Sequence, residues 1–162
     1  MQNKISKLKD HYIVCGFGRV GKQVCEDLEH SKVDFLIIDR DQREIKLAQS
    51  KGYLYVEEDP TLEISLEKAN IKQAKALISC LGQDTDNLFV TLTARSLNPN
   101  IYIVTRANEE ENVNKFEKAG ANRVAIPYQI GGYHMATMAL RPAVLDFLDV
   151  IVDSRHQELE VE

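Results

Sequence analysis

The chain has 162 residues, 44% of them hydrophobic, which is enough apolar content for the core of one domain. Its formal net charge of −5 and the lack of a basic patch argue against nucleic-acid binding. There is no run of about 18 apolar residues, and the polar start of the chain lacks the apolar segment of a signal peptide, so neither a membrane span nor a secretion signal is expected. Its three cysteines, an odd number without paired spacing, fit a reducing cytoplasm.

Short apolar runs alternate with amphipathic stretches along most of the chain. The apolar runs predict strands over residues 12–15, 35–39, 53–57, 76–80, 101–106 and 123–126. The stretches between them predict helices over residues 19–30, 42–51, 62–69, 84–97 and 109–119. Glycines and prolines at the joints support this division: Gly52, Pro60, Gly82, Pro99 and Gly120.

This alternation predicts an α/β fold with a Rossmann-like, doubly wound parallel sheet of six strands. Right-handed crossovers and a switch point after the first strand give the strand order 3-2-1-4-5-6. Residues 11–128 form this lobe. Two further helices are expected over residues 129–140 and 142–152, separated before Pro142.

The first predicted strand runs into a glycine-rich turn with the pattern of dinucleotide-binding proteins. Gly16 permits the tight turn, Gly18 lets the backbone approach a pyrophosphate, and Gly21 lets the next helix pack closely on the strand. The N-terminus of that helix offers free N–H groups to phosphate. We therefore expect a nucleotide site that includes the whole turn: Gly16, Phe17, Gly18, Arg19, Val20 and Gly21.

Asp39 closes the second predicted strand and completes the nucleotide-binding pattern. Its carboxylate can accept hydrogen bonds from ribose hydroxyls and would repel a 2′-phosphate. The expected ligand is therefore NAD(H) or an adenine nucleotide (AMP, ADP or ATP), favoured over NADP. Arg40 follows and can lie over the face of an adenine.

Two loops follow the third and fourth predicted strands, at the edge where open α/β sheets bind ligands. Asp59, in the first loop, is interpreted as a partner of adenine or ribose, as a cap of the next helix, or as both. Leu81 begins the second loop and is expected to border the ligand. Asp84 is interpreted as a helix cap.

Several other residues have both a functional and a purely structural interpretation. Arg19 is read either as a clamp that senses the number of phosphates or as a surface arginine, and Arg106 either as facing the same crevice or as surface. Cys15 and Cys80 end neighbouring strands, and small buried side chains are favoured over a redox switch. An acidic face of the last helix (Asp146, Asp149 and Asp153) is interpreted as solvated, and no histidine is expected to be a metal ligand or a general base.

The last helix, over residues 142–152, is apolar nearly all round. It must cover its own sheet or become buried in another subunit. Residues 154–162 are polar and then alternate like the start of a strand, so we treat them as a linker or as the beginning of a truncated C-terminal lobe.

Several segments carry, in order, the resemblance of this chain to a known family. They read HYIVCGFGRVG, IIDRD, EEDPT with LEKANI, and EKAGANRVAIPYQIGG, and the segment LRPAVLDFLDV is most like the channel-associated members. Over residues 8–152 the chain resembles the nucleotide-binding lobe of TrkA-N domains, the regulators of potassium conductance (RCK) in prokaryotic channels and Trk/Ktr uptake systems. It departs from many members at Glu58, where they have glycine.

The resemblance implies a ligand-sensing regulatory domain at the cytoplasmic face of the membrane, not an enzyme, whose nucleotide controls potassium transport. It implies that residues 1–10 are a linker from an upstream membrane pore. It also implies that residues 129–153 hold a crossover helix and a dimerisation helix, which build a homodimer or larger ring.

A small NAD-dependent oxidoreductase or redox-sensing nucleotide-binding protein is the alternative. A dehydrogenase needs a place for its substrate and a proton donor, yet six strands use most of the chain. None of the six tyrosines has a lysine four residues later, as a short-chain reductase requires. The glycine turn has no lysine, which excludes a P-loop phosphotransferase.

Overall fold

The computed structural model describes the backbone of residues 1–159 and the side chains of residues 1–151. The chain forms two compact units, Met1–Pro127 and the residues that follow from Tyr128.

The first unit is built on a six-stranded parallel sheet in the order β3-β2-β1-β4-β5-β6, which confirms the predicted topology. Cys15, at the end of β1, pairs with Ile38 of β2 on one side and with Ser79 of β4 on the other. The carboxyl ends of these three strands therefore meet where the strand order switches, the usual place for a ligand. The strands are β1 Tyr12–Cys15, β2 Phe35–Asp39, β3 Leu54–Glu57, β4 Ala76–Ser79, β5 Tyr102–Arg106 and β6 Arg123–Ala125.

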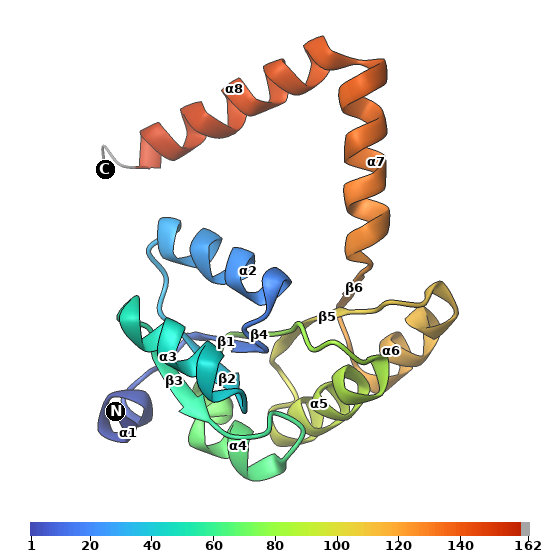
Figure 1. Ribbon diagram of the computed structural model, residues 1–162. Coiled ribbons are helices and arrows are strands. Elements are labelled where there is room, and N and C mark those ends of the chain that lie inside the picture. Colours follow the sequence, from blue (N-terminus) through green and yellow to red (C-terminus); the bar gives the residue numbers. More distant parts are fainter. Residues whose placement is uncertain (160–162) are drawn as a thin grey trace. The chain divides into compact units, whose positions relative to one another are not determined.

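Helices connect the strands and cover both faces of the sheet. Figure 1 shows α2 on one side of the sheet and α4 and α5 on the other. The segment expected as one helix over residues 109–119 is divided into a 3-10 turn and a short helix. The connecting elements are α2 Arg19–His30, α3 Gln42–Ser50, α4 Glu63–Lys68, η1 Ile71–Gln73, α5 Asp84–Leu97, η2 Glu110–Asn112 and α6 Val113–Ala119.

Alternate side chains of each central strand enter different cores. Val14 of β1 packs with Cys25 of α2 and Ala48 of α3. Its neighbour Ile13 belongs to the core on the opposite face, which includes Leu66 of α4. This two-sided burial explains why the strands read as continuous apolar runs.

A short N-terminal helix, α1 (Gln2–Ser6), belongs to the first unit. The expectation that residues 1–10 are a linker from a membrane pore stays a prediction, and the structure adds that this segment contains a helix. Ile5 is fully buried in the same core as Leu66 and Ala69. A single helical turn is too short to be recognised by its periodicity.

The second unit holds α7 (Pro127–Leu140) and α8 (Pro142–Leu159), which meet at a bend around Arg141. Pro142 has no N–H to continue α7, so the helix ends before it. Helix α8 runs beyond residue 152 into the segment expected as a linker or truncated lobe. The strand-like pattern expected over residues 159–162 begins at Leu159, which is the last residue of α8, and residues 160–162 lie outside the described residues.

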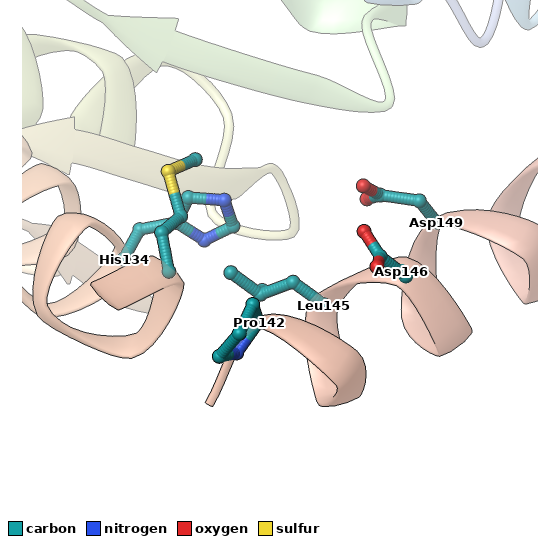
Figure 2. A pocket seen from close by; sticks show the side chains of 6 residues that line it. His134, Pro142, Leu145, Asp146 and Asp149 are labelled. Atoms are coloured by element: carbon teal, nitrogen blue, oxygen red, sulfur yellow. The ribbon is translucent and has the colours of Figure 1, made fainter. Parts of the chain in front are cut away.

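The inner side of this bend forms a pocket of about 240 Å³. Figure 2 shows the carboxylates of Asp146 and Asp149 side by side on α8, with His134 opposite on α7. Leu145 is the buried residue of this bend. Among the side chains of residues 1–151, no group of three or more His, Cys, Asp or Glu could hold a metal ion.

Candidate functional site

The glycine turn after β1 has the geometry that its sequence predicts. Gly16 adopts a φ of 95°, in the left-handed region that favours glycine. A Cβ on Gly21 would lie 2.0 Å from the carbonyl oxygen of Gly16, so only glycine allows α2 to pack this closely on the turn.

Gly18 differs from these two glycines because nothing in the fold requires it. Its φ is −78°, which any residue adopts, and a Cβ built there meets no atom within 4 Å. The residue lies directly before the N-terminus of α2, where free N–H groups favour anions. Arg19, the first residue of α2, is exposed beside this open space.

Asp39 connects the glycine turn to the end of β2. Its Oδ2 accepts a hydrogen bond from the Phe17 N–H at 2.7 Å, and its Oδ1 accepts one from the Asp41 N–H at 2.7 Å. The Phe17 ring is fully buried under the turn, so Phe17 contributes backbone to this site. A carboxylate has about four lone pairs, so Asp39 retains acceptor capacity for ribose hydroxyls.

A pocket of about 240 Å³ opens beside Asp39, at the carboxyl ends of the central strands. It brings together four of the predicted site residues from three different loops, namely Asp39, Arg40, Asp59 and Leu81. The remaining lining residues were not expected in the site from the sequence: Pro60, Thr61, Gly82, Gln83 and Asp86.

Asp59 lines the pocket but does not cap α4, because the N-cap residue of α4 is Leu62 and no side chain caps that helix. Contact of Asp59 with adenine or ribose stays a prediction. The Oδ1 of Asp59 accepts hydrogen bonds from the hydroxyl and the N–H of Thr61, at 2.7 and 2.9 Å. These two bonds, helped by the charge of Arg40, hold the pKa of Asp59 below its ordinary value. Its Oδ2 lies 3.7 Å from Nη1 of Arg40, so the two lining residues form an ion pair.

Asn87, which no sequence pattern indicates, connects the ends of β4 and β5. Its Oδ1 accepts bonds from the Ser79 hydroxyl and the Leu81 N–H, at 2.7 and 2.9 Å. Its Nδ2 donates to the carbonyls of Leu81 and Arg106, at 3.0 and 3.1 Å. The side chain is fully buried and fully used, so it fixes the position of Leu81 in the pocket.

Asp84 does not cap its own helix, contrary to our expectation. Its carboxylate accepts hydrogen bonds from the N–H groups of Asn108 and Glu109 and from Nδ2 of Asn112. Partial burial acts to raise the pKa of Asp84, but these bonds outweigh it and the pKa is lowered. Asp84 therefore holds the loop that follows β5.

The two candidate arginines do not line this pocket. Arg19 lies at the start of α2, on the side of the glycine turn. Arg106 directs its Nε to Oδ1 of Asn108 at 3.2 Å, within the loop that Asp84 holds. Of the three arginines predicted for the site, Arg40 lines the pocket, and Arg19 and Arg106 do not.

The three cysteines are free and buried. Burial raises the pKa of all three thiols, to about 12 for Cys25 and for Cys80. Because thiolates are the reactive form, these side chains behave as small apolar groups. This outcome favours the interpretation of the cysteines as small buried side chains over that of a redox switch.

Comparison with known proteins decides the family. The model of the TrkA-N domain matches residues 12–127, which is most of the chain. The chain belongs to the TrkA-N domain family. This finding confirms the resemblance to RCK domains that the motifs indicate.

Two relatives of this TrkA-N domain come from Methanocaldococcus jannaschii. "Probable potassium channel protein 2" is 47% identical over 99% of this chain and 48% of that protein. "Potassium channel protein 1" is 39% identical over 99% of this chain and 49% of that protein. The TrkA-N chain therefore spans about half the length of the curated relatives it matches. Within the described residues no helix is long and apolar enough to cross a bilayer.

Solved structures of the GsuK protein have the same fold. The GsuK RCK domain is 31% identical and superposes with a TM-score of 0.70, over 80% of this TrkA-N chain and 28% of that chain. GsuK bound to ADP is 24% identical with a TM-score of 0.74, over 83% and 36% of the two chains. The GsuK channel bound to NAD is 24% identical with a TM-score of 0.67, over 75% and 22%.

Proposed function

We propose that this TrkA-N domain is a ligand-sensing regulatory domain that binds NAD(H) or an adenine nucleotide and controls potassium transport by a channel or transporter. The observation that carries the proposal is the position of Asp39. This acidic residue bonds the N–H of Phe17 in the glycine turn and also lines the pocket at the ends of the strands. Ribose hydroxyls beside Asp39 would place phosphates toward the N-terminus of α2 and the base toward Arg40 and Leu81.

The choice of ligand follows from charge. Asp39, Asp59 and Asp86 make the pocket acidic, with Arg40 as the cation among its lining residues. A 2′-phosphate beside Asp39 would be repelled, so NAD is favoured over NADP. GsuK, a relative in fold, is described as bound to ADP in one structure and to NAD in another, which supports the same ligand class here.

The role in potassium transport is supported by the relatives. Both M. jannaschii proteins are described as potassium channel proteins, and each aligns along nearly the whole of this chain. We place the domain at the cytoplasmic face of the membrane, as the partner of a pore. We take it to be regulatory and not catalytic, since the three thiols are buried and the residues that line the pocket offer ligand-binding groups without an evident nucleophile or proton donor.

Assembly belongs to the same proposal. Helices α7 and α8 expose a run of large apolar side chains: Tyr128, Ile130, Tyr133, Met135, Met138, Leu140, Val144, Phe147, Leu148 and Val150. Large apolar side chains gathered in this way mark surfaces that bind another protein. We propose that it is buried between copies of the chain, in a homodimer or a larger ring.

Calorimetry with AMP, ADP, ATP, NAD, NADH and NADP tests the ligand class, together with mass spectrometry of nucleotide that co-purifies with the protein. We expect micromolar dissociation constants, on the order of −8 kcal/mol, for at least one adenine nucleotide or for NAD(H), and weaker binding of NADP. No binding of any of the six would contradict the proposal. Oxidation of NADH in the presence of candidate substrates would instead favour an oxidoreductase.

A further inference from the structure

Lys68, the last residue of α4, contacts two parts of the molecule at once. Its Nζ lies 2.5 Å from Oε1 of Glu58, the residue directly before Asp59 in the pocket loop. Its carbonyl oxygen accepts a hydrogen bond from Nε2 of Gln2 in α1, at 2.9 Å. One residue therefore joins the pocket loop to the N-terminal helix.

The N-terminal side of this connection is an extended docking contact. Ile5 is fully buried with Leu66 and Ala69 of the α4 segment. Nδ2 of Asn70 donates to the carbonyl oxygen of Leu8 at 3.0 Å. A ring nitrogen of His11, Nε2, lies 2.9 Å from the carbonyl oxygen of Ala69. The segment that leads into β1 is thus held along the end of α4 by apolar and polar contacts together.

The loop that lines the pocket is likewise connected directly to α4. Asp59, Pro60 and Thr61 line the pocket and lead directly into α4. The Ser65 hydroxyl donates to the carbonyl oxygen of Asp59, and the Leu62 N–H donates to the same oxygen at 3.1 Å. A displacement of Asp59 is therefore passed to a helix of only six residues, whose other end carries α1.

We infer that occupancy of the pocket is coupled to the docking of α1, through α4 and the contact of Glu58 with Lys68. The inference rests on the proposed nucleotide binding and adds how that binding is read out. An ion pair as exposed as Glu58–Lys68 contributes little stability by itself. Its effect is to hold the pocket loop and the end of α4 at one separation, so that a ligand that orders Asp59 also orders the residues that bind Gln2.

Hydrogen exchange of the 162-residue protein, with and without saturating AMP or NAD, tests the coupling. The amides to follow are those of Lys4, Ile5, Lys7 and Leu8, which are hydrogen-bonded within α1 and the turn after it. We expect ligand to slow their exchange by about threefold or more, because a docked helix opens less often. Calorimetry on the same sample establishes that the ligand is bound.

Two charge-neutralising variants locate the connection. In Glu58→Gln, AMP should still bind, because Glu58 does not line the pocket, but at least half of the slowing at α1 should be lost. Glu67→Gln makes the same change of charge at an exposed position on α4 and should behave like the wild type. A Glu58→Gln variant that keeps the full slowing would overturn the assigned connection.

A reciprocal measurement completes the test. Because coupling between two sites is mutual, Gln2→Ala should raise the dissociation constant of AMP by about threefold. Nucleotide binding without any change of exchange at α1 would overturn the coupling and leave the proposed function intact. Failure of AMP and NAD, and of every other nucleotide tested, to bind would overturn both.

Discussion

The carboxylate of Asp39 holds the backbone of Phe17, with Oδ2 2.7 Å from the Phe17 nitrogen. The bond joins the acid at the end of β2 to the glycine turn at the end of β1. The proposed ribose contact and the proposed phosphate contact are therefore parts of one hydrogen-bonded unit. A change at Asp39 should affect both binding and the shape of the turn.

Replacing Asp39 by alanine should weaken NAD or adenine-nucleotide binding by about 1.5–3 kcal/mol, from the loss of charge-assisted bonds to ribose. It should also lower the free energy of unfolding by about 1–3 kcal/mol, because the Phe17 N–H loses its partner. Calorimetry and urea unfolding measure the two effects. Asp34→Ala, an exposed aspartate just before β2, is the control and should change neither. Equal affinity in wild type and Asp39→Ala would contradict the assigned role.

The glycines of the turn should separate stability from binding. In Gly21→Ala the new Cβ meets the Gly16 carbonyl oxygen, so we expect a loss of about 3 kcal/mol or more in unfolding free energy. In Gly18→Ala the new methyl group meets no protein atom, so stability should change by no more than about 1 kcal/mol. Its affinity for nucleotide should nevertheless fall about tenfold, or about 1.4 kcal/mol. An unchanged affinity would mean that phosphate does not approach Gly18.

Arg19→Gln should reveal whether the site distinguishes ligands by their number of phosphates. A guanidinium at the start of α2 can bond two phosphate oxygens as a fork, and glutamine cannot. We expect about fivefold weaker binding of ADP and ATP, and a smaller loss for AMP. Lys46→Gln, an exposed lysine of α3, provides the control for loss of one positive charge. A uniform loss across the three nucleotides would show that Arg19 does not sense phosphate number.

The stability of the first unit should depend on the buried imidazole of His11. Burial lowers the pKa of His11, although the backbone bond to Ala69 and the charges of Asp34 and Asp10 act in the opposite direction. Its Nδ1 has no hydrogen-bond partner among the described residues. Well above pH 6.5 the ring is neutral in both states. As the pH is lowered through 6.5 the unfolded chain binds the proton more readily than the folded chain, so the stability decreases as the pH decreases.

Urea unfolding between about pH 5 and 7.5 checks this dependence, whose slope from one group is at most about 1.4 kcal/mol per pH unit. The variant His11→Phe leaves the Ala69 carbonyl unpaired and should be less stable throughout. Its pH profile should be flatter than that of the wild type in this range. Parallel profiles for the two proteins would exclude His11 as the source.

The apolar surface of α7 and α8 should drive self-association. Leu145 is buried in the bend of this unit, so Phe147 and Leu148, which are exposed, are better targets for substitution. The double variant Phe147→Glu with Leu148→Glu should be a monomer by light scattering, while the unmodified chain is at least a dimer. It should still bind nucleotide, because the pocket lies in the first unit. Arg141→Glu gives the same change of net charge and should stay associated; a wild-type chain that is monomeric at tens of micromolar would contradict the proposal.

Much of the site could be predicted from sequence because its parts are local. The strand, the glycine turn, the helix and Asp39 follow one another within 28 residues of chain, from Tyr12 to Asp39. The roles of these glycines can be predicted without knowing the tertiary contacts. The backbone itself requires glycine, because of a left-handed φ at Gly16 and a close approach at Gly21. The same reasoning could not find Asn87, because a buried amide that joins two strands has no local pattern.

The sequence by itself determined the family, the strand order and the nucleotide-binding turn, because apolar periodicity and glycine positions are properties of neighbouring residues. Only the tertiary structure decided which loops meet at the pocket, that Asp84 holds the loop after β5, and that Lys68 links Glu58 to Gln2. Those relationships join residues far apart in the chain, and they exist only once the sheet has brought the ends of its strands together.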